Sequence, residues 1–160
     1  MWKKTTYPSP LGDLTLASHG DALAGLWLAG QKHFGGKLPI TTIETGETPA
    51  LQAACAWLTR YFVGEQPAAA ELTLAPVGTP FQQRVWEVLR AIPHGEVTTY
   101  GDIALRLNCV SARAVGGAVG RNPISIIIPC HRVVGASGGL TGFAGGLDAK
   151  RQLLTIEGRV

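Results

Sequence analysis

The chain has 160 residues, of which 46% are hydrophobic and 16% charged, with 21 glycines and 10 prolines. This length and composition are typical of a globular protein with one ordinary domain or two small ones. No apolar run approaches the roughly 18 residues that a membrane span needs, and the N-terminus lacks the apolar stretch of a signal peptide. We expect a cytoplasmic protein that does not contact membranes.

The cysteines argue against a disulfide framework and against a structural zinc site. Cys55, Cys109 and Cys130 are an odd number of cysteines without CxxC spacing. Both kinds of site normally need paired or closely spaced cysteines. We therefore expect reduced cysteines and no structural zinc site. We also expect no other bound metal and no cofactor.

The net charge of +3 is unevenly distributed along the chain. Residues 79–160 contain nine Lys and Arg residues against five acidic residues, whereas residues 1–78 have a net charge of −1. Eight of these nine basic residues are arginines, which suit phosphate contacts and stacking on bases. Taken alone, an excess of four positive charges is also typical of an ordinary solvated surface.

The first half of the chain has strand patterns followed by one helix. Turn residues separate three alternating segments and predict an antiparallel meander of residues 2–7, 14–17 and 23–28. Thr48 and Pro49 then open an apolar helical stripe that Gly64 ends. With a candidate short strand at 72–74, we expect a first domain over residues 1–78.

The second half is predominantly helical, and we expect it to form a second domain over residues 79–160. Thr79 to Gln82 form a capping box with proline at the first helical position. Thr99 and Ser111 are placed to cap two further short helices joined by a tight turn. Such a pair suggests a helix-turn-helix, although any small helical domain can contain one.

The helix expected after Ser111 is unusually rich in small residues. Gly116, Gly117 and Gly120 each cost about 1 kcal/mol relative to alanine in a helix interior. A close approach to the helix backbone would explain them, and the approaching partner is either another helix or DNA. In the DNA alternative, Arg113 is the long side chain near the start of this helix.

The strongest candidate for chemistry is a cysteine that follows an apolar run. Ile126–Ile128 lead into Pro129, Cys130, His131 and Arg132, so we expect a thiol at the end of a buried strand. The neighbouring base and positive charge would favour the reactive thiolate. Because neighbouring side chains of an extended chain point to opposite faces, a contact between thiol and imidazole requires a bend at Pro129 or a bridging water.

Glu157 is the candidate group for orienting the base. It ends the helix expected over residues 148–157, where the helix dipole disfavours an unpaired carboxylate by about 0.3 to 1 kcal/mol. Pairing with His131 would offset this cost and complete a relay of nucleophile, base and orienting group with Cys130. The alternative is a solvated terminal glutamate. The glycine-rich segment 135–146 has no phosphate-loop pattern and suggests a pocket wall beside the thiol.

Several of these motifs together resemble the O6-alkylguanine-DNA alkyltransferase family. The resemblance lies in AVGGA (114–118), RNP (121–123), IPCHRVV (128–134) and GGL (145–147), and extends loosely to the Ser9–Gly12 turn. It implies an α+β fold with two parts. The N-terminal part would be a ribonuclease H-like domain of a small antiparallel sheet and a helix, and the C-terminal part a mostly helical domain with a winged-helix-like helix-turn-helix.

The resemblance also implies direct-reversal DNA repair. An alkyl group would move irreversibly, once per molecule, from O6-alkylguanine in double-stranded DNA to a cysteine, after the nucleotide has turned out of the duplex. This is the activity of a methylated-DNA–[protein]-cysteine S-methyltransferase (EC 2.1.1.63), and O4-alkylthymine is a further candidate substrate. We expect a monomer and leave cooperative binding on DNA open.

The roles implied by this resemblance fall on three groups of residues. The catalytic group is Cys130 as acceptor, His131 as base through a water, Glu157 orienting His131, Asn122 supporting the thiol's loop, and Tyr100 as general acid. The DNA-binding group comprises Tyr100 and Arg113, which help to turn out the nucleotide and fill its space, together with Ser111, Ala112 and Gly116. The pocket group is Val133, Phe143, Ala144 and Gly145.

Three features depart from the family pattern. The turn at residues 108–111 is one residue shorter than usual, which affects the placement of Tyr100 relative to Arg113. Ala144 stands where the human-type protein has a serine, so a backbone amide would have to contact the alkylated oxygen. The N-terminal cysteines that hold zinc in some members are missing, in line with the expectation of no metal.

Three other functions explain part of the pattern. A non-enzymatic alkyltransferase-like sensor of DNA damage would flip and bind the base without transfer, but such proteins have another residue in place of the acceptor Cys130. A cysteine hydrolase would be unusual with adjacent cysteine and histidine, and it leaves the helix-turn-helix unexplained. A helix-turn-helix regulator lacks an evident dimerisation segment.

Overall fold

The computed structural model describes residues 1–108 and 111–159. Cys109 and Val110, which belong to the turn that is expected to be one residue short, lie outside these ranges. The chain forms an α+β fold whose strands and α-helices follow in the order β1 (Trp2–Ser9), β2 (Gly12–His19), β3 (Ala22–Leu28), β4 (Glu44–Thr45), α1 (Pro49–Phe62), α2 (Pro80–Arg90), β5 (Thr98–Thr99), α3 (Tyr100–Arg106), α4 (Ala112–Gly120), β6 (Val133–Val134) and α5 (Leu147–Ile156). Three short 3-10 helices are η1 (Ile40–Thr42), η2 (Ala69–Glu71) and η3 (Cys130–Arg132). The predicted fold class is confirmed.

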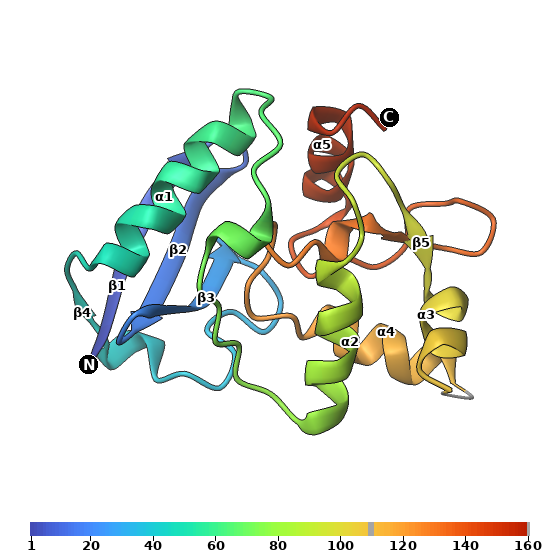
Figure 1. The fold of residues 1–160 in the computed structure, drawn as a ribbon, viewed down its shortest axis with the longest axis horizontal. Helices are drawn as coiled ribbons and strands as arrows, with labels where there is room; N and C mark the ends of the chain where they lie inside the picture. Colours follow the sequence, from blue (N-terminus) through green and yellow to red (C-terminus); the bar gives the residue numbers. More distant parts are fainter. Residues whose placement is uncertain (109–110, 160) are drawn as a thin grey trace.

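The N-terminal sheet contains the predicted antiparallel meander and one strand more. Its order is β3-β2-β1-β4, with α1 lying across it (Figure 1). Strand β4 pairs in parallel with β1 over only two residues, which is too short for an alternating pattern to reveal. Thr48 caps α1 as predicted, its hydroxyl accepting a bond from the Leu51 N–H over 3.1 Å.

The edge strand β3 is where the two halves of the chain meet. The Leu26 N–H donates to Pro123 O over 2.8 Å, and the Ser125 N–H donates to Leu26 O over 3.0 Å. Further along β3, Leu23 forms a single bridge with Leu74, so the candidate strand at 72–74 is a bridge and not a strand. These bonds fix the segment that leads to Cys130 against the sheet.

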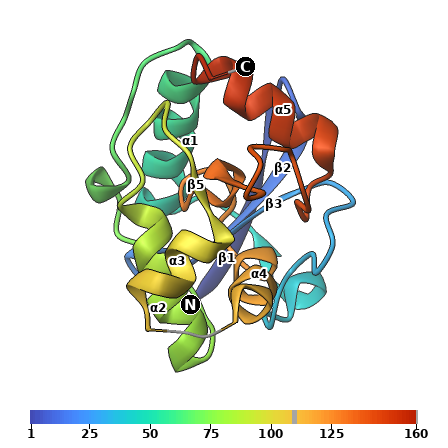
Figure 2. The same ribbon diagram turned by 90° about the vertical axis from the view of Figure 1, so that its right-hand side faces the viewer.

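The helices α2, α3 and α4 begin where the sequence predicts, and α5 begins at Leu147, one residue before its predicted start. Thr79 and Gln82 exchange side-chain-to-backbone bonds of 3.1 and 2.9 Å, which closes the capping box of α2. Thr99 caps α3 and Ser111 caps α4 in the same way. Figure 2 shows α3 and α4 next to each other, with α5 at the opposite end of this half.

One hydrophobic core runs through both halves and positions the helices around the site. Its members include Leu26 of the sheet, Tyr61 of α1, Trp86 of α2 and Val115 of α4. Trp86 also donates its indole N–H to Ala118 O over 2.9 Å, which ties α2 to α4. None of the helices within residues 1–108 and 111–159 has the length and apolar character of a membrane span.

Candidate active site

The thiol is presented by a buried turn and not by the predicted end of a strand. The run Ile126–Ile128 cannot continue as a strand because Ile126 has a left-handed φ of 73°. This conformation costs a β-branched residue roughly 1 to 3 kcal/mol, which burial of the Ile126 side chain offsets. Pro129 then enters the 3-10 helix η3, so the chain does bend directly before Cys130.

The carboxylate of Glu157 collects several donors in a fully buried position. Oε2 of Glu157 lies 2.6 Å from Nε2 of His131, and the side chains of both residues have no exposed surface. Arg132 donates from Nε to Oε1 over 2.7 Å and from Nη2 to Oε2 over 3.0 Å. The Tyr61 hydroxyl of α1 donates to Oε2 over 2.6 Å. The alternative of a solvated terminal glutamate is therefore wrong.

Burial and neighbouring charges shift the pKa values of His131 and Glu157 in opposite directions. Burial raises the pKa of Glu157, but the bonds and charges of His131 and Arg132 outweigh it and hold this pKa well below its usual range. Burial lowers the pKa of His131 against the opposing attraction of Glu157. The ionised carboxylate thus faces a neutral imidazole, and we assign the ring proton to Nε2. Nδ1 is buried and has no hydrogen-bond partner among the described residues, so its lone pair is free to take a proton.

The thiol of Cys130 rests in its neutral form. Burial raises its pKa, and the opposing influences of Asn122, Lys150 and Ser125 do not outweigh that burial. A neutral thiol needs a base at the moment of attack, because the thiolate is the nucleophile.

The positive charge near the thiol is not the predicted one. The guanidinium of Arg132 bonds to Glu157 and donates from Nη1 to Ile92 O over 2.6 Å, so the expectation that Arg132 favours the thiolate directly is wrong. Lys150 of α5 provides that charge and lowers the pKa of Cys130. The sequence does hold a signal for Lys150, which shares one helical face with the apolar Leu153 and Leu154.

Cys130 lines a cavity of about 570 Å³, a size suited to a small flat ligand. The cavity lies between α4 and the loop that precedes α5, with Lys32 and His33 of the loop after β3 also contributing. Its other lining residues are Tyr100, Gly116, Gly117, Val119, Gly120, Arg121, Thr141, Gly142, Phe143 and Ala144. The thiol, the predicted general acid Tyr100 and the pocket residues Phe143 and Ala144 therefore share one cavity.

Two side chains hold the loop that forms one wall of this cavity. Lys150 donates from Nζ to Thr141 O over 2.7 Å and to Gly142 O over 3.3 Å, while burial lowers the pKa of Lys150 to about 8. The Tyr100 hydroxyl reaches the same carbonyls over 3.3 and 3.4 Å. Burial raises the pKa of Tyr100, so its hydroxyl keeps its proton at neutral pH.

The three glycines of α4, Gly116, Gly117 and Gly120, line the cavity. A Cβ added to Gly117 or Gly120 would meet no atom within 4 Å, so helix packing does not explain these two glycines. The Gly116 position faces the Tyr100 ring at about 3.7 Å. Ala112 and Arg113 are exposed at the start of the helix and do not line the cavity. The N-terminal turn and the glycine face of α4 are thus two separate parts of its surface.

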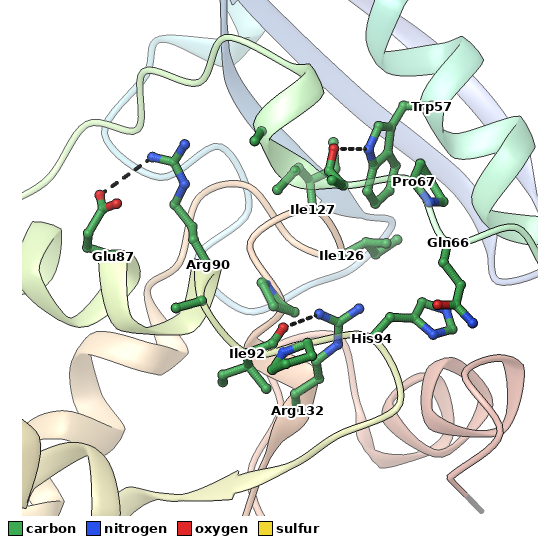
Figure 3. Close-up of a pocket in the computed structure, with 16 residues that line it drawn as sticks. Trp57, Gln66, Pro67, Glu87, Arg90, Ile92, His94, Ile126, Ile127 and Arg132 are labelled. Carbon is green, nitrogen blue, oxygen red and sulfur yellow. Dashed lines mark hydrogen bonds and ion pairs between the residues drawn. The ribbon is translucent and has the colours of Figure 1, made fainter.

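A second cavity, of about 520 Å³, contains none of the predicted site residues. Figure 3 shows it between Trp57 and the Ile126–Ile127 turn, with Arg132 and His94 at its edge. It has no cysteine among its lining residues, so the cavity with Cys130 is the candidate active site. Within the described part of the chain, no cluster of three or more His, Cys, Asp or Glu side chains could hold a metal ion.

Two family profiles match almost the whole chain. Residues 2–76 match the ribonuclease-like domain of 6-O-methylguanine DNA methyltransferase, and residues 80–159 match its DNA-binding domain. The chain belongs to the 6-O-methylguanine DNA methyltransferase family. This membership confirms the resemblance and the two-part fold expected from the sequence.

Relatives in this methyltransferase family match over nearly their full length. The chain is 46% identical over 154 residues to the methylated-DNA–protein-cysteine methyltransferase of Haemophilus influenzae, covering 96% of this chain and 84% of that protein. The crystal structure of Mycobacterium tuberculosis OGT in complex with DNA has a TM-score of 0.84 at 45% identity and covers 98% and 91% of the two chains. An O6-methylguanine DNA methyltransferase from Methanococcus jannaschii has a TM-score of 0.66 at 31% identity, covering 98% and 93%.

Not every residue assigned by resemblance to the methyltransferase family reaches the cavity. Val133 is fully buried and pairs with Thr98 between β6 and β5, and it does not line the cavity. Gly145 also lies outside the lining, and its lack of a side chain lets Phe143 and Leu28 approach to about 3 Å of a Cβ position. Of the two, Gly145 acts on the cavity indirectly, by making room for Phe143, which lines it.

Proposed function

We propose that this methyltransferase repairs DNA by moving an alkyl group from the O6 oxygen of guanine to Cys130, once per molecule. The observation that carries the assignment of Cys130 is its position in the cavity beside α4, one residue from the buried His131–Glu157 pair. DNA repair by alkyl transfer follows from the family to which the chain belongs. The product is a thioether, and no residue of the site offers chemistry that would reverse it.

Activation of the thiol falls to His131. The neutral ring holds its Nε2 proton toward Glu157 and leaves Nδ1 as the base. The proton of Cys130 passes through a water to Nδ1, and the ionised Glu157 stabilises the imidazolium that forms. Burial then favours attack, since a thiolate out of water is poorly solvated and strongly nucleophilic.

The transfer step exchanges one bond for another. The Cys130 sulfur attacks the alkyl carbon, the S–C bond forms, and the C–O6 bond breaks with its electron pair on the guanine oxygen. Tyr100, which lines the same cavity, donates its hydroxyl proton to the guanine anion and regains a proton from solvent. Its raised pKa keeps the hydroxyl protonated until this step.

The approach of DNA to the thiol uses both parts of the α4 surface. The target carbon lies inside a base stack, so the nucleotide must leave the duplex at a cost of a few kcal/mol. We assign insertion into the vacated space to Arg113, phosphate contacts to the helix start at Ser111 and Ala112, and close backbone approach to Gly116. The Ala144 backbone takes the place of a side-chain contact to the alkylated oxygen.

The remaining assignments belong to the same proposal. A structural domain over residues 1–78 and a DNA-binding and acceptor domain over 79–160 agree with the two profile ranges. We propose a cytoplasmic monomer that acts on double-stranded DNA containing O6-alkylguanine.

Mass spectrometry after incubation with duplex DNA containing O6-methylguanine tests this function. We expect a gain of about 14 Da on a peptide containing Cys130 and on no other cysteine peptide. The Cys130→Ala variant should bind the same duplex as tightly as the wild type and gain no mass. A wild-type protein that binds tightly but stays unmodified would instead be a damage sensor.

A further inference from the structure

The N-terminal half of the chain reaches the catalytic pair through one side chain. Tyr61 of α1 is fully buried, and its hydroxyl lies 2.6 Å from Oε2 of Glu157, a residue 96 positions away in the sequence. The local sequence does not predict this bond to Glu157, because Tyr61 lies in the apolar helical stripe that begins after Thr48. The sheet-and-helix half therefore contributes a hydrogen bond to the His131–Glu157 pair.

The ring of Tyr61 has little freedom to move its hydroxyl elsewhere. It stacks on Trp57 with centroids 5.5 Å apart and an interplanar angle of 8°, and Phe62 and His94 meet it edge-on at 5.2 and 6.1 Å. Trp57 is fixed in turn by its bond to Ala68 O, drawn in Figure 3. Burial and the charge of Glu157 raise the pKa of Tyr61, so the hydroxyl remains a donor.

Tyr61 and His131 use the same carboxylate oxygen. A hydrogen bond to a carboxylate stabilises its charge and makes it a weaker proton acceptor. The other groups around the pair are Arg132, which bonds both oxygens of Glu157, and Lys150, which acts on His131 through its charge. The Gly95 N–H contributes a long contact of 3.4 Å to Oε1. Among these donors, the Tyr61 hydroxyl alone comes from the N-terminal half.

We propose that Tyr61 is a positioning residue that keeps His131 neutral and available as a base. By sharing Oε2 it holds Glu157 in place and limits how strongly the carboxylate attracts a proton onto the imidazole. Without the hydroxyl, the carboxylate charge acts more fully on His131, and the imidazolium becomes easier to form. The inference rests on the proposed alkyl transfer, in which neutral His131 accepts the thiol proton.

Replacement of single hydroxyls tests this inference. Tyr61→Phe removes the bond to Glu157 and keeps the ring. Tyr7→Phe is the matched control, because it also removes a single hydroxyl. The Tyr7 hydroxyl bonds over 2.9 Å to Thr59 of α1, the helix that contains Tyr61, whereas the Tyr61 hydroxyl bonds to Glu157. Nuclear magnetic resonance of 15N-histidine protein, assigned with His131→Gln, follows protonation of His131 in each protein without any DNA.

We expect the His131 ring of Tyr61→Phe to become protonated about one pH unit higher than in the wild type, and that of Tyr7→Phe to be unchanged. An identical His131 titration in Tyr61→Phe and wild type would overturn the proposal. This result decides the role of Tyr61 even if the wild type transfers no alkyl group, an outcome that would defeat the proposed function separately.

The rate of transfer against pH provides the functional readout. For Tyr61→Phe we expect the acid side of the profile to move to higher pH, with up to about a tenfold loss of rate there and a wild-type rate on the plateau. A uniform loss at every pH, with a lowered melting temperature, would instead mean that Tyr61 only supports the fold, and would contradict the proposal.

Discussion

Asn122 holds Ile128 by a buried hydrogen bond of 2.7 Å from its side-chain amide to the Ile128 carbonyl. The other side of the same amide accepts the Ile124 N–H over 3.0 Å, so one side chain ties both ends of the turn that precedes the thiol. The strained Ile126 lies between these two attachment points. A single asparagine thus closes the turn that aims Cys130 into the cavity.

Replacement of Asn122 by alanine should destabilise the protein and make the thiol less acidic. The substitution leaves the buried Ile124 N–H without its partner, which costs about 1 to 3 kcal/mol. The Ile128 carbonyl loses one of two donors and keeps the Cys130 N–H over 2.8 Å. Asn122 also lowers the pKa of Cys130, so this pKa should rise further in the variant. Urea unfolding and the pH dependence of thiol alkylation by iodoacetamide measure the two effects. An unchanged thiol titration would mean that Asn122 supports only the turn.

Substitution of Glu157 by glutamine should be among the most damaging single changes in the second half. It removes the counter-charge of the buried Arg132, and breaking a buried pair in this way costs about 3 to 5 kcal/mol. We expect this loss in urea unfolding at pH 7. Asp148→Asn, which removes an exposed partner of Arg151, is the control and should change stability by less than about 1 kcal/mol.

The wild-type protein should lose stability on acidification, and the pKa values of His131 and Glu157 set the pH range of this loss. The pKa of His131 is lowered from an ordinary value of 6.5, and that of Glu157 is lowered from 4.5. In both cases the unfolded chain takes up a proton at a pH where the folded chain does not, so the free energy of unfolding falls as the pH falls. The urea concentration at the midpoint of unfolding should be constant near pH 7 to 8. It should decline below about pH 6.5, and more steeply below about pH 4.5. A midpoint independent of pH between 7 and 4 would contradict the assigned ionisation.

Local signals in the sequence were sufficient for most of the fold. The helix caps at Thr79 and Thr99 act within three residues along the chain, so composition and spacing reveal them. The two-residue strand β4 and the bond from Tyr61 to Glu157 depend on contacts between distant segments, and no local pattern encodes them. Long-range pairing is decided by the packing of the whole core.

The candidate site divides in the same way between local and distant contacts. The adjacency of Cys130 and His131 is visible in the sequence, but the left-handed turn at Ile126 is hidden because isoleucine rarely adopts this conformation. The position of Arg132 in the sequence predicts that it is a charge beside the thiol. Its guanidinium fits the planar carboxylate of Glu157 better, with two parallel bonds, and Lys150 is left to face the thiol.

Replacement of Lys150 by methionine should loosen the loop at residues 141–144 and slow alkyl transfer by roughly tenfold. The loop carbonyls lose the stronger of their two shared donors and keep only the Tyr100 hydroxyl, and Cys130 loses the nearby positive charge that lowers its pKa. Because the pKa of Lys150 is lowered to about 8, the wild-type rate should decline as the pH rises through this value, and the variant should lack that decline. Arg151→Met, at the exposed next position, should match the wild type. Transfer rates between pH 6 and 9 and limited proteolysis of the loop measure both effects.

Alanine at Gly117 should change stability and DNA binding in opposite directions. The added methyl group meets no atom within 4 Å, and alanine favours a helix over glycine by about 1 kcal/mol, so the melting temperature should rise. If DNA approaches the backbone of α4 on this face, the same methyl group occupies the space that it needs, and affinity for O6-methylguanine duplex should fall severalfold. Gln52→Ala, on the exposed side of α1, controls for stabilisation away from the cavity. Fluorescence anisotropy and thermal melting measure the pair of effects, and higher stability with unchanged affinity would place the DNA elsewhere on the protein.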